Sequence, residues 1–233
     1  MTTAESFQRI YQRACDRKGG EAALAALLGH SASAAEISVI PDNLLLGELT
    51  KKVFQSGFVW RVVRQKWPGF CEVFFDFDIE KILLMSDEML EAKARDERII
   101  RNAAKVFTIR DNALMIDDIA AKHGSFARFI ADWPTTDIIG LWAYLKQHGA
   151  RLGGNTGPYA LRAIGKDTFI LSTDVEAYLR ASNVFDGGIN SKRSLAQIQQ
   201  QFNLWQQQSG SSLQHISQII ALSVGENYLG MQQ

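Results

Sequence analysis

The segment Leu152-Gly-Gly-Asn-Thr-Gly-Pro-Tyr159 is a glycine-rich turn between two stretches that have the apolar periodicity of helices. A helix is predicted over residues 137–148, and a second one begins near Thr156, a good capping residue, with Pro158 in its first turn. Four of the six residues from Gly153 to Pro158 are Gly or Pro, so backbone N–H groups could approach a phosphate. The turn therefore predicts a phosphate-binding site that is independent of base sequence. The alternative is an ordinary corner between two helices that binds nothing, because Gly and Pro occur at such corners too.

The residues that follow the turn make the pattern more specific. The next segment is Phe169-Ile-Leu-Ser-Thr-Asp-Val-Glu-Ala-Tyr-Leu-Arg180. It begins with three apolar residues, continues with the capping pair Ser172 and Thr173, and is predicted to form a third helix that begins at Asp174. This arrangement resembles the helix–hairpin–helix DNA glycosylases, which place a catalytic Asp at this distance beyond their hairpin. The resemblance implies that Asp174 is the catalytic carboxylate.

Three further segments resemble the 3-methyladenine DNA glycosylase I branch of that superfamily. Gln55-Ser-Gly-Phe-Val-Trp60 is similar to its Gln-Ala-Gly-Leu-Ser-Trp element, Ile99-Ile-Arg-Asn-Ala-Ala-Lys105 to its Ile-Ile-Arg-x-x-x-Lys element, and Leu145-Lys-Gln-His-Gly-Ala-Arg-Leu-Gly-Gly-Asn-Thr-Gly-Pro-Tyr159 to its hairpin. The resemblance implies an all-α, two-lobed fold. We expect residues 42–166 to form a central helical bundle that ends in the hairpin, and residues 1–41 plus 167–233 to form a second helical lobe.

Composition limits the possible partners. The 233 residues are 46% hydrophobic and 21% charged, which indicates a globular protein with a substantial core. Twenty-five basic residues balance 25 acidic ones, so contact with DNA has to rely on local positive patches. No apolar run approaches the length of a membrane span, so we expect a cytoplasmic protein. We also expect a monomer that is associated with the bacterial nucleoid.

No metal and no cofactor are expected. Cys15 and Cys71 are far apart and the four histidines are scattered, so no ligand cluster for zinc or an iron–sulfur centre is recognisable. The tail lacks the Cys/His pair that completes a zinc site in the 3-methyladenine branch, and the start of the chain lacks that branch's His-Asp-x-Glu-Trp-Gly element.

The segment from Asp42 to Trp67 is predicted to form two helices joined at Gly57, with Asp42 as the first cap. Gln55 and Trp60 then flank a tight corner. By resemblance this corner faces a base flipped out of the DNA, and the electron-rich Trp60 ring could stack on a methylated purine. The alternative is that Trp60 is a core residue.

One position departs from the family in a way that concerns the substrate. Lys52 stands where the 3-methyladenine enzymes have a Glu that recognises the base, and a lysine repels a cationic base. Glu48 lies one turn earlier and either reaches into the pocket or pairs with Lys52, the reading we favour. An alkylated purine remains the first candidate substrate, but 3-methyladenine itself is in doubt.

The rest of the centre reads as scaffold. Asp78 and Ser86 are predicted caps of short helices, and further helices are predicted over residues 99–113, 115–122 and 125–132. The cations Arg98, Arg101 and Lys105 are interpreted as a solvated face. The hairpin residues assigned to the DNA backbone are Gly153, Gly154, Asn155, Thr156 and Gly157.

The function predicted from these patterns is removal of a damaged base from double-stranded DNA. Bifunctional glycosylases use a hairpin Lys as a Schiff-base nucleophile, and the matching residue here is Pro158, which has no amine. We therefore predict a monofunctional enzyme of base excision repair that leaves an abasic site. Two alternatives stay open: a non-catalytic helix–hairpin–helix DNA-binding module, and a helical protein-interaction domain.

Overall fold

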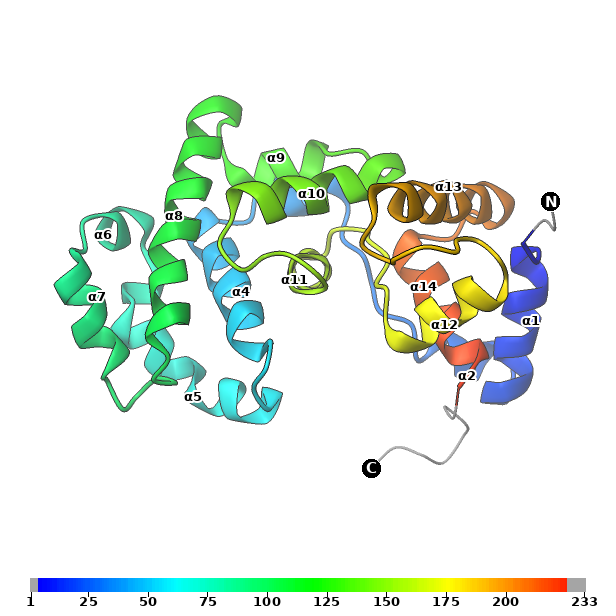
Figure 1. The fold of residues 1–233 in the computed structure, drawn as a ribbon, viewed down its shortest axis with the longest axis horizontal. Helices are drawn as coiled ribbons and strands as arrows, with labels where there is room; N and C mark the ends of the chain where they lie inside the picture. The colour runs from blue at the N-terminus through cyan, green and yellow to red at the C-terminus, as the bar shows by residue number, and fades with distance from the viewer. Residues whose placement is uncertain (1–3, 226–233) are drawn as a thin grey trace. The chain divides into compact units, whose positions relative to one another are not determined.

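The computed structural model describes residues 4–225, and all regular structure in that range is helical (Figure 1). The prediction of an all-α fold is confirmed. None of the described helices is both long and apolar enough to cross a membrane. The helices are α1 Phe7–Lys18, α2 Glu21–Ala25, α3 Ala34–Ser38, α4 Asp42–Gln55, α5 Trp60–Val73, η1 Phe75–Phe77, α6 Ile79–Leu83, α7 Asp87–Ala94, α8 Ala103–His123, α9 Phe126–Asp132, η2 Thr135–Asp137, α10 Ile138–His148, α11 Thr156–Ile164, α12 Thr173–Ala181, α13 Lys192–Ser209 and α14 Leu213–Ser223.

The chain divides into two compact units. One, the terminal unit, contains residues 4–31, Pro134–Ile139 and residues 167–225; the other, the central unit, contains Ala32–Trp133 and Gly140–Lys166. The boundaries differ from those predicted, because residues 32–41 group with the central unit and residues 134–139 with the terminal unit. There α3 packs against α9, and the Ala32 N–H donates to Gly165 O at 2.9 Å, so this segment is bonded to the end of α11.

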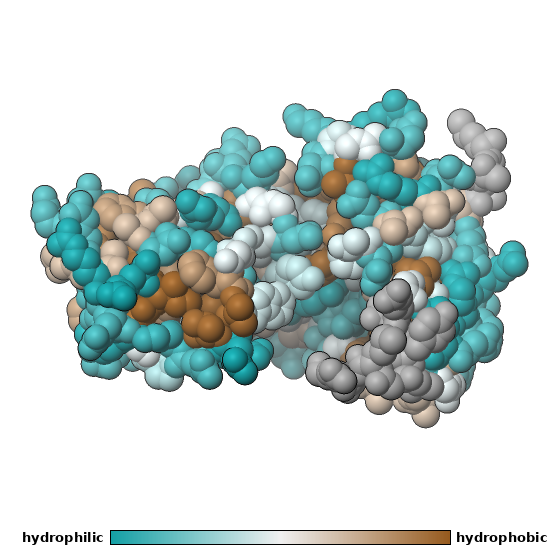
Figure 2. All heavy atoms as spheres, turned by 60° about the horizontal axis from the view of Figure 1, so that its bottom comes forward, coloured by the Kyte–Doolittle hydropathy of each residue, from teal (hydrophilic) through white to brown (hydrophobic). Residues whose placement is uncertain are grey.

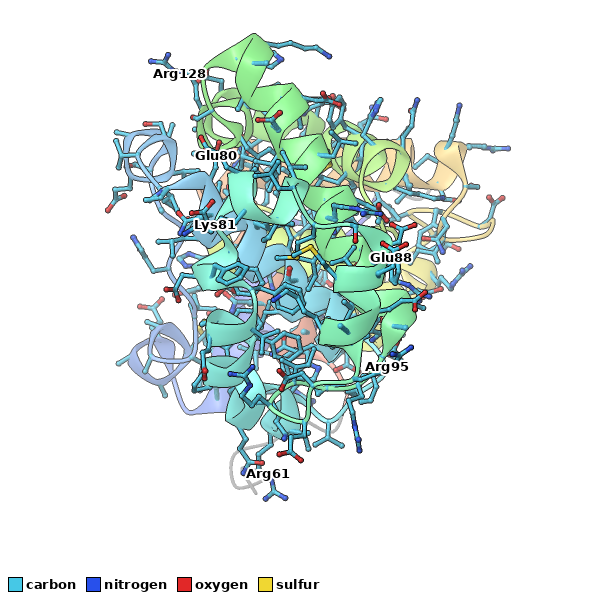
Figure 3. The ribbon with its side chains drawn as sticks, turned by 90° about the vertical axis from the view of Figure 1, so that its left-hand side faces the viewer. Arg61, Glu80, Lys81, Glu88, Arg95 and Arg128 are labelled. Atoms are coloured by element: carbon cyan, nitrogen blue, oxygen red, sulfur yellow. The ribbon has the colours of Figure 1, made fainter. Side chains whose placement is uncertain are left out.

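The central unit is built around the long helix α8. Its apolar face of Val106, Ile109, Ala113 and Ile116 is fully buried, and α8 packs against α4, α6, α7 and α9. Separate helices were predicted over 99–113 and 115–122, but one continuous helix runs from Ala103 to His123 because no Gly or Pro interrupts it. Arg61, Glu80, Lys81, Glu88, Arg95 and Arg128 project outward from the helices of this unit, so its solvated face carries both charge signs (Figure 3).

The terminal unit has its own core. Helix α14 packs against α1, α12 and α13, and the large buried side chains include Ile10, Phe202 and Trp205. The Phe202 ring stacks on Phe169 with centroids 4.1 Å apart. The indole N–H of Trp205 donates to Glu5 O at 3.0 Å, so the segment before α1 is bonded to α13. Each unit therefore buries its own apolar surface.

Several helix starts have the predicted caps. The side chains of Asp78, Ser86 and Ser172 accept backbone N–H groups of α6, α7 and α12. The prediction for Asp42 is wrong: it is the first residue of α4, and its carboxylate accepts the N–H groups of Phe126 and Ala127 at 2.9 and 3.0 Å. Asp42 therefore caps α9, a helix that is distant in sequence and adjacent in the folded unit.

Candidate functional site

The α4–α5 corner carries the first part of the site. Helix α4 ends at Gln55, Gly57 turns the chain with φ +86°, and α5 begins at Trp60. Because this φ is in the left-handed region, glycine is suited to the turn. Three apolar side chains beside the turn are exposed, with 66% of Val59, 46% of Trp60 and 39% of Val62 accessible. The space-filling view shows hydrophobic surface on the unit that contains this corner (Figure 2).

The corner and the hairpin of the same unit line one cavity. Its volume is about 340 Å³, within the size range of small-ligand sites. The walls come from Lys52, Gln55, Ser56 and Trp60 on one side and from residues 153–156 and Tyr159 on the other. The structure thus brings together three of the four residues predicted for base recognition and four of the five predicted for the DNA backbone, all within the central unit.

Two aromatic rings and a lysine define the chemistry of this cavity. The Trp60 and Tyr159 rings meet edge to face, with centroids 5.9 Å apart and planes at 84°. Lys52 Nζ lies 5.3 Å from the Trp60 ring centroid, within the range of a cation–π contact. Burial lowers the pKa of Lys52, while the charge of Glu48 raises it and that of Lys51 lowers it. Trp60 is therefore half-exposed and already has a cation beside it.

Gln55 contributes a buried amide to the same wall. The residue is 7% exposed, and its Oε1 atom has no hydrogen-bond partner among the described residues. A buried polar atom without a partner costs about 1–3 kcal/mol. A hydrogen-bond donor on a bound molecule would relieve this cost, so Gln55 Oε1 is available as an acceptor in this cavity.

Glu48 lies outside this cavity. Its carboxylate pairs with Lys51, not with Lys52, so the expected ion pair forms with a different lysine. Glu48 lines a separate cavity of about 310 Å³ together with Trp67, Asp76 and Phe77. Lys51 Nζ also lies 4.5 Å from the ring centroid of Trp67, which lines this second cavity. Lys51 is therefore held beside Glu48, three residues away on α4, and forms the ion pair.

The hairpin backbone is held by hydrogen bonds within the turn. Thr156 N–H donates to Gly153 O at 3.3 Å and Gly157 N–H to Leu152 O at 3.1 Å. The prediction that Thr156 caps the helix is wrong, since Asn155 holds the N-cap position without a side-chain cap bond and Thr156 is the first helical residue. Two of the five nominated amides are therefore used inside the turn, and Gly153 and Gly154 are the better candidates for contact with phosphate.

Glycine is required at two hairpin positions by close approach or backbone conformation. A Cβ at residue 157 would lie 2.6 Å from Leu152 O, a clash with backbone that cannot move aside. Gly154 has φ +59° and open space around it, so conformation rather than crowding selects glycine there. The stem of Lys146 packs over Gly153, which places an exposed cation beside the turn. Exposed Arg151 adds a second.

Two residues that support the site were not found from the sequence. Asn112 of α8 is fully buried; its Nδ2 donates to Ala150 O at 3.2 Å, and its Oδ1 accepts Ala150 N–H at 2.8 Å. Lys105 is 6% exposed, so assigning it to a solvated face is wrong. Its Nζ donates to the carbonyls of Val53 at 2.8 Å, Phe54 at 3.4 Å and Ser56. Asn112 thus fixes the hairpin, and Lys105 fixes the end of α4.

Asp174 belongs to the terminal unit. Ser172 caps α12 by accepting the Val175 N–H at 3.4 Å, and Asp174 is the second helical residue, partly exposed. A Cβ at residue 225 would lie 2.9 Å from Asp174 Oδ1, so the backbone at Gly225 approaches the carboxylate closely. The Arg17 guanidinium donates to Gly225 O at 2.5 Å and fixes that backbone.

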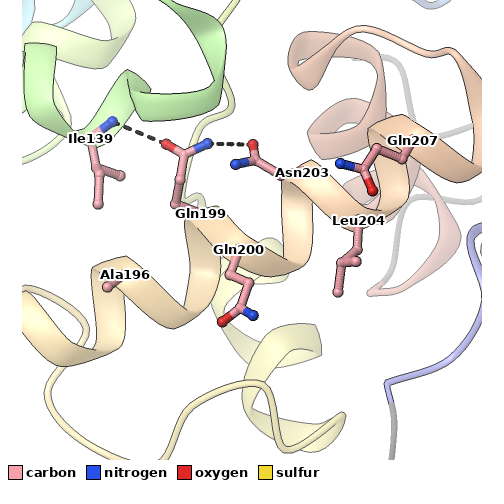
Figure 4. A pocket seen from close by; sticks show the side chains of 7 residues that line it. All are labelled: Ile139, Ala196, Gln199, Gln200, Asn203, Leu204 and Gln207. Carbon is pink, nitrogen blue, oxygen red and sulfur yellow. Dashed lines mark hydrogen bonds between the residues drawn. The ribbon is translucent and has the colours of Figure 1, made fainter.

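A further cavity in the terminal unit has no titratable lining. Ile139, Ala196, Gln199, Gln200, Asn203, Leu204 and Gln207 surround it (Figure 4). The Gln199 amide accepts the Ile139 N–H at 3.1 Å and donates to Asn203 Oδ1 at 2.8 Å, so three of the lining residues are bonded to one another. This cavity offers no acid, base or nucleophile, so we do not assign the chemistry to it.

Comparison with known proteins gives the family. The model of the methyladenine glycosylase family matches residues 37–160, more than half of the chain, and the protein belongs to that family. The match spans the α4–α5 corner, α8 and the hairpin.

The chain also matches three solved structures of 3-methyladenine DNA glycosylase I. A variant bound to 3-methyladenine is 22% identical, with 61% of this chain and 83% of that one covered and a TM-score of 0.49. A second structure is 25% identical over 53% and 79%, with a TM-score of 0.46, and the Staphylococcus aureus enzyme is 21% identical over 65% and 91%, with a TM-score of 0.49.

The zinc site of the resembled branch has no counterpart in residues 4–225. No group of three or more His, Cys, Asp or Glu side chains there is arranged to hold a metal ion. Cys15 and Cys71 lie in different units, and burial raises the pKa of both thiols, which disfavours the thiolate form that binds zinc. The residues present do not fit a structural zinc.

Proposed function

We propose that this protein is a monofunctional DNA glycosylase that hydrolyses the N-glycosidic bond of a damaged base in double-stranded DNA. The observation that carries the proposal is the cavity between the α4–α5 corner and the hairpin. It combines an accessible indole face, a buried unpaired amide oxygen and a glycine-rich turn in one unit of a methyladenine glycosylase family member. A flipped base needs a stacking surface and hydrogen-bond partners, and its backbone needs amide donors.

Each part of the cavity has a role in this proposal. The base stacks on Trp60, and Gln55 Oε1 accepts a hydrogen bond from a donor on the edge of the base. The amides of Gly153 and Gly154, with Lys146 and Arg151 nearby, bind phosphates without reading sequence. The DNA grip therefore depends on backbone groups and local cations, which is how a chain of zero net charge binds a polyanion.

Asp174 is the proposed catalytic carboxylate. Breaking the glycosidic bond leaves positive charge on the sugar, and a carboxylate stabilises that charge and orients water for the attack. Asp174 lies in the first turn of α12, close to the partial positive charge of the helix N-terminus. No amine stands at the hairpin position of the bifunctional nucleophile, where buried Pro158 lies, so release stops at an abasic site.

The test is single-turnover base release from alkylated duplex DNA by the wild type, Asp174→Asn and a matched control, Glu176→Gln. Glu176 lies on the same helix and pairs with Arg180 at 2.8 Å, so its substitution removes a nearby charge outside the proposed role. We expect Asp174→Asn to slow release by about 10²–10³-fold with unchanged DNA binding, and the control to stay near wild type.

Three results would change the proposal. Equal release by Asp174→Asn and the wild type would remove Asp174 from catalysis. DNA binding by all three proteins, with no release of alkylated, deaminated or oxidised bases, would favour the non-catalytic DNA-binding module. A borohydride-trapped adduct with DNA would show a Schiff base and contradict the monofunctional mechanism.

A further inference from the structure

The cavity between the α4–α5 corner and the hairpin has one charged side chain in its lining, that of Lys52. The remaining lining consists of amide, hydroxyl, aromatic and glycine residues. The carboxylate one turn earlier on α4, that of Glu48, is engaged by Lys51 and lines the other cavity. The wall of the site therefore carries a net positive charge with no carboxylate to balance it.

Lys52 also lies beside the surface on which a base would stack. Its Nζ is 5.3 Å from the centroid of the Trp60 ring, where the ammonium gains from the electron-rich face. A purine methylated at a ring nitrogen carries positive charge in the nucleotide, and on Trp60 it would lie next to this ammonium. The two cations would repel each other, so the cavity disfavours the cationic bases that an aromatic site without a lysine would attract.

The hydrogen-bonding groups of this wall form a donor and an acceptor three residues apart. Lys52 and Gln55 project from the last turn of α4, where residues three apart share a face. The ammonium offers N–H donors, and Gln55 Oε1 is an acceptor without a partner. A neutral base with a carbonyl next to a ring N–H has the complementary pair of groups on one edge.

Accepting the glycosylase function proposed above, we propose that this cavity selects neutral deaminated bases, with hypoxanthine as the purine member of the class. The base carbonyl accepts a hydrogen bond from the Lys52 ammonium, the adjacent ring N–H donates to Gln55 Oε1, and the ring stacks on Trp60. Uracil has the same carbonyl and N–H edge on a smaller ring. Deamination creates this edge by replacing an amino group with an oxygen, so the pair Lys52 and Gln55 separates hypoxanthine from adenine and uracil from cytosine, whereas guanine and thymine carry the same edge.

The experiment compares two duplexes in single-turnover release by the full chain, one with a single deoxyinosine and one with a single 7-methylguanine. We expect the acceleration over spontaneous release to be at least about tenfold greater for hypoxanthine, which corresponds to a screened charge–charge repulsion at a half-buried site. The spontaneous rates are needed as the reference because the cationic 7-methylguanine is the better leaving group. Lys52→Met should slow hypoxanthine release about tenfold, because it removes the donor, and Lys52→Glu should reverse the preference. Lys51→Met is the matched control and should leave the preference unchanged.

The outcomes separate this inference from the function on which it rests. Release of 7-methylguanine alone, sensitive to Asp174→Asn, would overturn the inference and leave the glycosylase function standing. Absence of release from every duplex would remove the glycosylase function. In that case calorimetric binding of free hypoxanthine, compared with a dialkylated adeninium ion, still tests the cavity.

Calorimetry also measures the binding of the free bases by variants whose base release is impaired. A preference for hypoxanthine that is lost in Lys52→Met and in Gln55→Leu supports recognition by these two side chains. Equal or tighter binding of the adeninium ion by the wild type overturns it.

Discussion

Replacing Lys105 by methionine should destabilise the central unit more than replacing any other charged residue of α8 by a neutral one. The Lys105 ammonium is buried and donates to three carbonyls at the C-terminal end of α4, those of Val53, Phe54 and Ser56. The last carbonyls of a helix have no partners inside it, so an ammonium at this point satisfies them and interacts favourably with the helix dipole. Burial lowers the pKa of Lys105, and the charge of Arg151 lowers it further.

The size of the loss follows from these bonds. Val53 and Phe54 are 1% and 0% exposed, so water cannot readily replace the lysine at their carbonyls. Each buried group left unpaired costs about 1–3 kcal/mol, and two of them cost about 3 kcal/mol after the methionine has recovered part of the packing. For a chain of this size about 3 kcal/mol lowers the melting temperature by roughly 6–12 °C.

Thermal and urea unfolding followed by circular dichroism measure this loss, with Lys122→Met as the control. Lys122 is exposed in the last turn of the same helix, so the same substitution there should change stability by no more than about 0.5 kcal/mol. If Lys105→Met unfolds within about 1 kcal/mol of the wild type, the three carbonyls are hydrated in the variant and our account of the α4 terminus is refuted.

Two further perturbations test other parts of the molecule. Gly157→Ala should destabilise the hairpin by about 2 kcal/mol, because the new Cβ would lie 2.6 Å from a carbonyl oxygen of the turn. The same variant should weaken salt-dependent duplex binding, measured by fluorescence anisotropy. The control Gly188→Ala, at a position in open space, should change neither quantity. Hydrogen bonds from Arg13 and Tyr178 hold the pKa of Glu5 below 4.5, so its stabilisation of about 1 kcal/mol is complete above that pH and is lost as pH falls through the lowered pKa. Urea unfolding should therefore show Glu5→Gln less stable than wild type at neutral pH, with a gap that narrows in acid; a gap independent of pH would contradict this.

The features that sequence predicted well have local causes. Ser172 and Ser86 cap helices because a short oxygen side chain bonds an N–H three residues on, within the same segment. Gly57 ends one helix and allows the turn into the next through its own backbone conformation. The hairpin was recognisable for the same reason, since its glycines and proline fix the turn within eight residues.

The features that sequence missed depend on which helices pack together. Lys105 has the pattern of a solvated cation until α8 lies against the end of α4. Asp42 is placed like a cap for its own helix, and its carboxylate bonds α9 instead. Two lysines on α4, Lys51 and Lys52, are close enough to Glu48 to form an ion pair. Lys51 forms it, because the Trp67 ring holds the Lys51 ammonium on the same side of α4 as Glu48. Spacing along one helix cannot decide such choices, because the competing partner lies on another helix.

The two walls of the candidate site are therefore under different constraints. The hairpin wall is mainly backbone, and Gly157 cannot change without a clash, so the conformation of the turn and the proposed DNA grip depend on the same residues. The α4 wall is made of side chains, and Lys52 is only partly buried, so a change of charge there leaves the helix and its packing intact. A single residue on this wall can shift the preferred base from a cation to a neutral ring while the fold and the phosphate contacts persist. Base preference in this family should accordingly follow the charge at position 52 more closely than it follows similarity of fold.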